Sequence, residues 1–394
     1  MRVLIVNRMI GTLLGGGETF DLGVARNLVK MGHDVTVVTA RPLLSVPRLS
    51  HADLNVVYLP TIDLRPLEAR SRKINQKMGA VWRHFDNHLF ERLVFSWFSR
   101  RSNYFEYNIV QCCSMIWLPK WIAERLRIPV VTWFPGPPSS LIQRVLPALV
   151  SHPHIGLFCH GDPVKILEKQ LGFIQGVHFE VIEPGIDFEL VQTYTSQRNK
   201  IRAELGVSPE TVVGVTVARL IPVKNIPFLI EGLEVVVHEL RMPIVWFFIG
   251  HGPERPFLER LTVAKGLQGC IRWLGQMPQS EVHKILAASD IFALTSVYES
   301  FSIATLEAMA HGLPIVATDV GYLRQMVKES HGGILIRVGD VEGLVQVIAR
   351  LVSDSDYRRM LGESGKVYAQ RFAWPNIVVR LLQFYEQVIV GRPM

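Results

Sequence analysis

Cysteine is scarce in this sequence, with four residues among 394. Cys112 and Cys113 are adjacent, while Cys159 and Cys270 stand alone, so the spacing is not that of a metal site. The dense cysteine framework of small disulfide-stapled domains is missing too. A reducing, cytosolic setting is therefore expected.

Long apolar runs are also absent. Apolar residues make up 48% of the chain and charged residues 20%, yet no run approaches the roughly 18 residues that a transmembrane helix needs. The opening residues are too short for a signal peptide and predict a strand instead. A chain of this length is large enough for two domains with separate hydrophobic cores.

Acidic residues are fewer than basic ones, and the formal net charge is +7. Such a charge suits nucleic acid, an anionic membrane or a phosphate-rich ligand. No helix-turn-helix, zinc-finger or RNA-recognition pattern is present, so nucleic acid is not expected as a partner. Much of the excess lies in residues 65–101, which hold nine Lys or Arg and three acidic residues.

Short apolar runs alternate with helical segments in two series, separated by a polar stretch at 193–200. Continuous apolar runs are typical of parallel strands that are buried on both faces. The alternation predicts an α/β protein with two doubly wound domains and a cleft between them. The expected strands are 3–7, 35–39, 56–58, 109–110, 129–132, 155–159 and 179–182, then 212–217, 244–249, 271–274, 290–294, 314–317 and 333–336.

The segment 296–310 is the most informative part of the chain. Glu299 lies in a polar loop after an apolar strand, and Glu307 lies about two turns into the helix that follows. A helix start gathers unpaired N–H groups and the positive end of the helix dipole, so it is a natural seat for a phosphate. Carboxylates on both sides of that seat suit a nucleotide-sugar. On spacing alone, two solvated surface glutamates remain an equal alternative.

With its flanking residues 288–295 and 311–319, this segment resembles the E-x7-E signature of retaining glycosyltransferases of the GT-B fold, family 4 in particular. The resemblance implies sugar transfer from a UDP- or GDP-sugar with retention at the anomeric carbon. It also implies two Rossmann-like domains facing a central cleft. The acceptor-side domain is expected at 1–190, completed by a C-terminal helix at 374–394, and the nucleotide-sugar-binding domain at 200–373.

The resemblance also assigns roles within the segment. Glu299 is expected to contact hydroxyls of the donor sugar, and Glu307 to hold the ribose. Amides near Phe301 and Ser302 are expected to meet the diphosphate. Ser300 and Ser302 stand where many family members carry glycine, which restricts the loop slightly.

Arg219 and Lys224 follow an apolar strand and resemble the family's strand-end Arg and its Lys five residues later. Breaking a sugar–diphosphate bond leaves extra negative charge on the phosphates, which needs stabilisation where water is excluded. Arg offers a planar fork and Lys a point charge for this purpose. Together with a helix start they can replace a divalent metal, so no metal or other cofactor is expected. Isolated Arg and Lys residues are more often plain surface charges.

Two glycine-rich turns complete the expected donor site. Gly16 and Gly17 resemble part of the family's Gly-Gly-x-Glu loop between the first strand and first helix, although a plain flexible loop is the alternative. This loop is not G-x-G-x-x-G, which argues against a nicotinamide oxidoreductase. Gly250 belongs to a turn that resembles Gly-x-Gly-Pro-Glu, and a tight turn alone also explains it.

The first half departs from the family at Phe134, where members often carry a histidine that reaches the donor sugar. Phenylalanine can shape a pocket but cannot hydrogen-bond a hydroxyl. A backbone group near Gly136, or the side chain of His160, is expected to take over, although His160 is more often a plain loop histidine. Phe134 also supports a second hypothesis, a catalytically degenerate protein that binds nucleotide-sugars without transferring them.

The one Asp-x-Asp sequence, Asp354 to Asp356, precedes a helix near the end of the chain. Capping of that helix explains it better than metal binding does. No metal site is therefore predicted.

The basic region 65–101 is also rich in aromatic residues, and its apolar residues recur at helical spacing on one face: Met78, Trp82, Phe85, Leu89 and Leu93. The preferred interpretation is that this face packs on the sheet of the first domain. The alternative is that this surface binds the anionic inner face of the cytoplasmic membrane and meets a lipid-linked acceptor there. The favoured function is a metal-independent, retaining glycosyltransferase with a glycan or lipid-linked acceptor.

Overall fold

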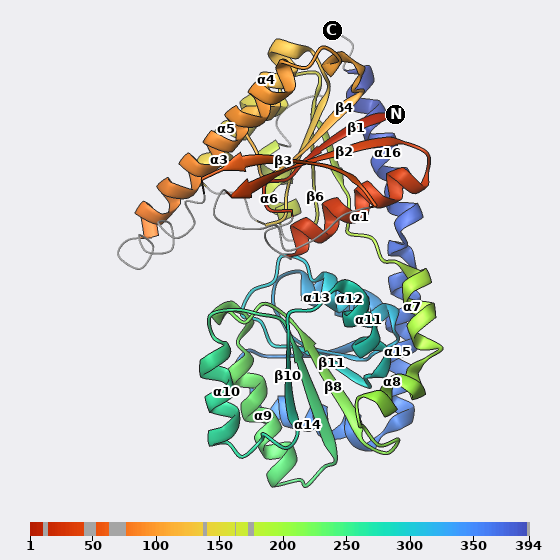
Figure 1. The fold of residues 1–394 in the computed structure, drawn as a ribbon. Helices are drawn as coiled ribbons and strands as arrows, with labels where there is room; N and C mark the ends of the chain where they lie inside the picture. The colour runs from red at the N-terminus through yellow and green to blue at the C-terminus, as the bar shows by residue number, and fades with distance from the viewer. Residues whose placement is uncertain are drawn as a thin grey trace. The chain divides into compact units, whose positions relative to one another are not determined.

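The computed structural model describes residues 1–10, 15–42, 53–62, 76–136, 140–161, 163–171 and 177–391 (Figure 1). The chain forms two units, Met1–Gly185 with Trp374–Met394 and Ile186–Ala373. Within the described ranges, no helix combines the length and the apolar character that a membrane crossing requires. Residues 65–75 of the basic region lie outside these ranges.

The first unit is built on a parallel sheet of seven strands in the order β3-β2-β1-β4-β5-β6-β7. Its strands are β1 (Arg2–Val6), β2 (Asp34–Pro42), β3 (Asn55–Thr61), β4 (Ile109–Cys113), β5 (Val130–Phe134), β6 (Ile155–Cys159) and β7 (His178–Val181). Its helices are α1 (Gly16–Lys30), α3 (Gln76–Ser99), α4 (Trp117–Trp121), α5 (Ser140–Val150), α6 (Pro163–Leu171) and α16 (Trp374–Val390), and α4 continues as the short π-helix η2 (Ile122–Leu126).

The second unit has a parallel sheet of six strands in the order β10-β9-β8-β11-β12-β13. Its strands are β8 (Val212–Val217), β9 (Ile244–Ile249), β10 (Ile271–Gly275), β11 (Ile291–Leu294), β12 (Ile315–Thr318) and β13 (Gly333–Ile336). Its helices are α7 (Phe188–Thr195), α8 (Arg198–Glu204), α9 (Ile226–His238), α10 (Arg255–Ala264), α11 (Gln279–Ala288), α12 (Ile303–Ala310), α13 (Gly321–Ser330), α14 (Val341–Ser353) and α15 (Ser355–Ala369).

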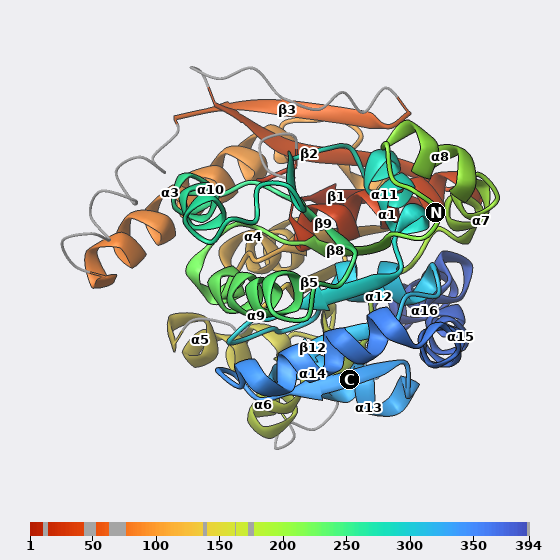
Figure 2. The ribbon, with the colours of Figure 1, turned by 90° about the horizontal axis from the view of Figure 1, so that it is seen from below.

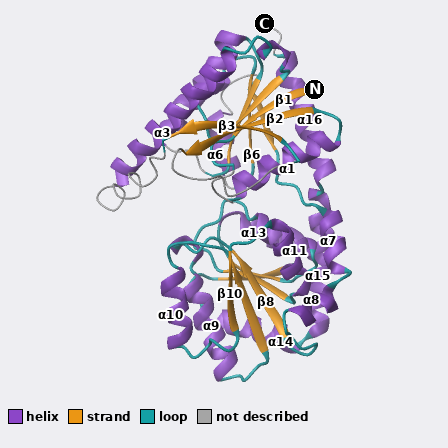
Figure 3. Cartoon of the chain, viewed as in Figure 1, coloured by secondary structure: helices purple, strands orange, loops and turns teal. Residues whose placement is uncertain are grey.

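Helices cover both faces of each sheet, as the purple and orange elements of Figure 3 show. In the first unit, alternate strand residues such as Leu4 and Phe134 join the core under α3 to α6, while Ile5 and Trp133 join the core under α1 and α16. Strands buried on both faces explain why their sequences read as unbroken apolar runs. The structure thus confirms the predicted fold class of two doubly wound α/β domains.

The terminal helix α16 is fixed to the first unit by its first residue, and Figure 1 shows it beside α1. A Cβ atom on Gly23 would lie 2.0 Å from the ring of Trp374, and one on Gly185 would lie 2.3 Å from it. Glycine at both positions therefore makes room for the indole. Further along α16, the hydroxyl of Tyr385 donates to the amide oxygen of Gln111 in β4.

A buried carboxylate joins α1 to three strands of the same sheet. Asp21 accepts hydrogen bonds from the side chains of Asn7 at 2.7 Å, Gln111 at 2.6 Å and Trp133 at 3.0 Å. Burial raises the pKa of Asp21 to about 7, although the three hydrogen bonds lower it. The three donors are neutral side chains in β4, in β5 and directly after β1, and their hydrogen bonds fix α1 to these strands.

Two smaller predictions have clear outcomes. Asp354 caps α15 by accepting a hydrogen bond from the amide of Tyr357 at 2.8 Å, which confirms the capping interpretation. The preferred interpretation of the basic region holds in part, because α3 packs on the core of the first unit but Phe85 and Leu89 of the expected face are 50% and 42% exposed. The face of α3 that packs on the core instead carries Phe90, Val94 and Phe98.

Candidate functional site

Three loops at the carboxyl ends of β8, β9 and β11 are tied to one another in the second unit. The amide of Val297 donates to the carbonyl of Val223 at 2.9 Å, and the hydroxyl of Thr295 donates to the carbonyl of Asn225 at 3.1 Å. The amide of Leu220 donates to the carbonyl of His251 at 3.0 Å. These bonds hold the loops where open α/β sheets bind ligands.

Lys224 and Glu299 form an ion pair within this group of loops, although 75 residues separate them in sequence. Their side chains are only 14% and 10% exposed. The hydroxyl of Ser296 donates to the same carboxylate oxygen of Glu299 at 3.3 Å. The two strongest sequence candidates are therefore in direct contact, in a place where water screens charge weakly.

Local backbone geometry positions both partners. Lys224 ends the short 3-10 helix η3 (Pro222–Lys224), and the next residue, Asn225, turns the chain with a φ of 46° into the start of α9. The carbonyl of Glu299 accepts a hydrogen bond from the amide of Tyr322 at 3.0 Å. Asparagine is one of the residues that adopt this left-handed conformation most readily.

Arg219 lies two residues after Val217, the last residue of β8, and its side chain is exposed. Within the described residues it makes no ion pair. An exposed guanidinium without an acidic partner remains available for an anion, and its planar fork suits two phosphate oxygens at once.

Helix α12 begins directly after the loop that carries Glu299. Ser302 is its N-cap and accepts hydrogen bonds from the amide of Thr305 at 3.2 Å and from its hydroxyl at 2.8 Å. Ser302 has φ −114°, a conformation that any residue adopts, so this position does not require glycine. The ring of Phe301 packs on that of Tyr322 with 5.1 Å between centroids.

Glu307 lies inside α12 and is only 6% exposed. The side-chain amide of Gln279, the first residue of α11, donates to its carboxylate. Burial raises the pKa of Glu307 to about 8, and the hydrogen bond from Gln279 opposes this shift. Without a ligand, the carboxyl group is therefore largely protonated at neutral pH.

The raised pKa of Glu307 predicts a pH-dependent cost in stability. A carboxyl whose pKa rises from 4.5 in the unfolded chain to about 8 in the folded chain destabilises the fold progressively as pH rises through that window. Glu307→Gln should therefore raise the free energy of unfolding at pH 9 by roughly 1–3 kcal/mol and change it little at pH 4.5. Urea unfolding of both proteins at the two pH values measures this difference. An equal effect at both would contradict it.

Close packing explains Gly250, in line with the alternative that this turn is simply a tight turn. Its φ is 137°, and a Cβ atom there would lie 1.9 Å from the carbonyl oxygen of Ala218. Its amide donates to the carbonyl of Gly275 at 2.8 Å. The close approach of the β8 and β9 loops therefore requires glycine, and this amide is already engaged within the protein.

Four of the predicted residues belong to the first unit. Gly16 and Gly17 form the first turn of α1 and not a loop, with Gly15 as the N-cap. A Cβ atom on Gly17 would lie 3.4 Å from Pro135, which is close to ordinary van der Waals contact. Gly136 follows β5, and a Cβ there would meet no atom of the described structure within 4 Å.

His160 and Phe134 are both buried in the first unit. His160 is 5% exposed and packs against the rings of Phe20 at 5.7 Å and Trp133 at 5.5 Å between centroids. Burial lowers its pKa to about 4, so it is a neutral side chain at physiological pH. Phe134 is 2% exposed and belongs to the core on the opposite face of the sheet. It therefore packs in the core of the first unit.

Sequence reasoning missed the partners of the two glutamates. Ser296 stands three residues before Glu299, so its position could have indicated the contact. Gln279 lies 28 residues before Glu307, and no local pattern connects them. One turn further along the same helices, His283 and His311 share a hydrogen bond of 2.9 Å, and burial lowers the pKa of each, to about 4 and about 3.

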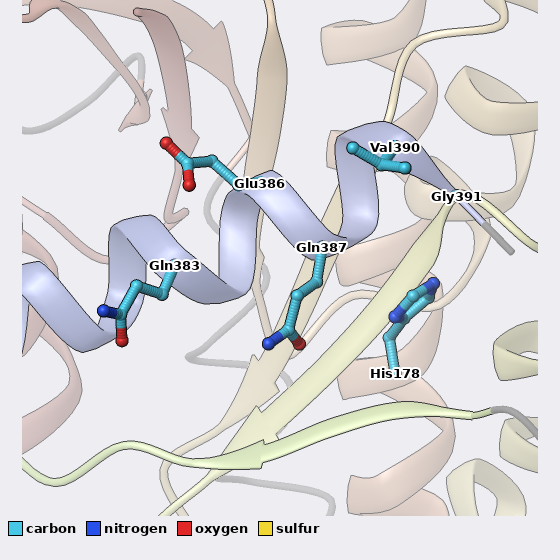
Figure 4. A pocket seen from close by; sticks show the side chains of 6 residues that line it. All are labelled: His178, Gln383, Glu386, Gln387, Val390 and Gly391. Atoms are coloured by element: carbon cyan, nitrogen blue, oxygen red, sulfur yellow. The ribbon is translucent and has the colours of Figure 1, made fainter.

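A separate hollow of about 590 Å³ lies in the first unit between β7 and α16. His178 contributes from the strand, and Gln383, Glu386, Gln387 and Val390 from the helix (Figure 4). His178 pairs with Gly156 at the amino end of β7. The hollow is therefore remote from the strand ends where α/β sheets bind ligands.

Comparison with known proteins shows that the chain is similar to glycosyltransferases, in sequence over its second half and in fold over its whole length. Residues 197–368 match the family model described as glycosyl transferases group 1. The sucrose-phosphate synthase of Thermosynechococcus elongatus superposes over 99% of both chains with a TM-score of 0.78 and 18% identity. Anabaena HepE in complex with UDP and glucose superposes over 97% of this chain and 98% of its own, with a TM-score of 0.71 and 19% identity.

Curated relatives match about half of this chain. The D-inositol 3-phosphate glycosyltransferase of Corynebacterium urealyticum is 31% identical over 215 residues, which are 53% of this chain and 51% of the relative. The N-acetyl-alpha-D-glucosaminyl L-malate synthase of Bacillus anthracis is 27% identical over 219 residues, 53% of this chain and 56% of its own. The chain thus spans about half the length of the curated relatives it matches.

Proposed function

We propose that this protein is a metal-independent, retaining glycosyltransferase that uses a UDP- or GDP-sugar. The observation that carries the proposal is the buried pair of Lys224 and Glu299, which lies with Arg219 and the start of α12 at one edge of the sheet. Two cations and a helix start suit a diphosphate, and the two carboxyl groups suit hydroxyls on either side of it.

Each residue then has a defined task. Arg219 and Lys224 hold the diphosphate and stabilise the charge that grows on it as the bond to the sugar breaks. Glu299, released from Lys224 when the phosphates arrive, accepts hydrogen bonds from sugar hydroxyls. Glu307 accepts hydrogen bonds from the ribose hydroxyls, and the hydrogen bond from Gln279 holds its carboxyl group in position. These roles follow from the charges and contacts of the site and from the family resemblance.

The reaction needs no protein base. The bond between the anomeric carbon and the phosphate oxygen breaks, and its electron pair stays on the phosphate. An acceptor hydroxyl forms the new bond on the same face, and its proton passes to the departing phosphate. Retention follows because arrival and departure share one face of the sugar. The acceptor is proposed to be a glycan or a lipid-linked glycan.

The degenerate binding protein is the second candidate. Its support was Phe134, and that side chain is part of the core of the first unit. The intact pairing of Lys224 with Glu299 favours a competent enzyme.

The test is release of nucleoside diphosphate from UDP-sugars and GDP-sugars, with and without EDTA, first alone and then with glycan or lipid-linked acceptors. We expect one donor class to be consumed at an EDTA-insensitive rate that an acceptor increases. Donor binding without any release under all conditions would favour the degenerate binding protein.

A further inference from the structure

Helix α3 presents an apolar face to solvent. Trp82, Phe85, Leu89 and Arg92 recur at intervals of three or four residues, so they share one side of the helix. Phe85 is 50% and Leu89 42% exposed, and the rings of Trp82 and Phe85 meet edge to face at 6.3 Å. In Figures 1 and 2 the first half of α3 extends beyond the strands of its own sheet.

The acidic residues of α3 point into the protein. Asp86 is 6% exposed and forms an ion pair with Arg8. Glu91 is 3% exposed and accepts a hydrogen bond from the amide of Leu118 in α4 at 2.5 Å. The helix therefore keeps its negative charges inside, while Arg92 is exposed.

The same contact places α4 and η2 beside α3. Trp117 is 39% exposed, and its ring lies 6.1 Å from that of His88. Trp121 packs edge to face on Phe95 at 5.7 Å. A recess of about 350 Å³ lies between these elements and is lined by Arg92, Phe95, Trp121 and Arg125.

Charges around this recess are mostly positive. Arg92, Arg125 and Arg127 are exposed and make no ion pair within the described residues. Lys120 faces Glu124 at 3.8 Å, and that pair contributes no net charge. A second copy of the chain docked symmetrically would bring these arginines face to face, which argues against self-association.

We propose that the outer face of α3 together with α4 and η2 binds the surface of an anionic lipid bilayer. Arg92 and Arg125 bind a headgroup phosphate at the recess, which they line together with the aromatic side chains of Phe95 and Trp121. Phe85, Leu89 and Trp117 enter the interfacial region, which suits a tryptophan with an apolar ring and a polar edge. This surface includes residues of α4 and η2 that no sequence pattern had joined to α3.

The test is co-sedimentation of the full chain with phosphatidylcholine vesicles and with vesicles that also contain phosphatidylglycerol, at low and high salt. The wild type should bind the anionic vesicles preferentially and less at high salt. Arg92→Glu with Arg125→Glu should lower the partition coefficient at least about tenfold, because each cation near an anionic surface is worth about a factor of five. Phe85→Ala with Trp117→Ala should weaken binding at both salt concentrations.

The matched control is Lys200→Glu with Arg359→Glu, an equal charge reversal at two exposed positions of the second unit. It should bind as the wild type does. Absence of wild-type binding to anionic vesicles, or equal loss in both charge-reversed proteins, would overturn the proposal. So would a dimer in sedimentation velocity that only the Arg92/Arg125 variant loses, because the face would then be a protein interface. Circular dichroism melting establishes that each variant is folded.

Discussion

Replacing Glu299 with glutamine is expected to lower kcat by about a hundredfold to a thousandfold. The amide keeps the size of the side chain but loses the charge that accepts hydrogen bonds from Ser296 and pairs with Lys224. In the proposed reaction it also weakens the contacts to the donor sugar as positive charge develops there. The rate of nucleoside diphosphate release measures the effect.

Two controls separate this effect from misfolding. Nucleotide affinity should not fall in Glu299→Gln, because the proposed contacts of Glu299 are to the sugar and loss of its charge leaves Lys224 free to bind the phosphates. Ser296→Ala removes the weaker neighbour at 3.3 Å and should cost much less activity. Unchanged turnover in Glu299→Gln would remove this residue from the catalytic site.

Lys224→Met is expected to lower kcat by about a hundredfold or more while the affinity for the free nucleotide falls less, because its charge acts most strongly on the departing phosphate. Methionine keeps the apolar stem of the lysine. Steady-state kinetics against donor concentration separate kcat from KM.

The two substitutions should not be additive, since Lys224 and Glu299 are in direct contact. In the double variant neither partner is left as an unpaired buried charge. In the ligand-free protein, where this pair is formed, the double variant should therefore lose less free energy of unfolding than the sum of the two single losses, as urea unfolding measures. Strict additivity would show that the two residues act independently, contrary to the ion pair in the structure.

Much of the fold could be predicted from apolar runs. The expected strands 155–159 and 244–249 coincide with β6 and β9, because parallel strands buried on both faces leave no polar residue to blur the signal. The first helix begins at Gly16, within the residues that the resemblance placed in a loop before that helix. Glycine has a low helix propensity, so the sequence did not indicate that Gly16 and Gly17 belong to the first turn of the helix.

The sequence predicted which residues belong to the site but not the contacts between them or their protonation states. It placed Arg219, Lys224, Glu299 and Glu307 in one domain, and the structure shows the ion pair of two of them. It could not predict the raised pKa of Glu307, which depends on burial by helices distant in sequence. Nor could periodicity show which side of α3 faces the core, because both sides carry large apolar residues.

Isothermal titration of the purified protein with UDP, GDP and ADP, with and without EDTA and repeated on Arg219→Ala, tests the central claim most directly. We expect tight binding of one nucleotide that EDTA leaves unchanged and that Arg219→Ala weakens about tenfold or more, as loss of a charge-assisted bidentate contact requires. No binding of any of the three nucleotides would contradict the assignment of the second unit as a nucleotide-sugar site.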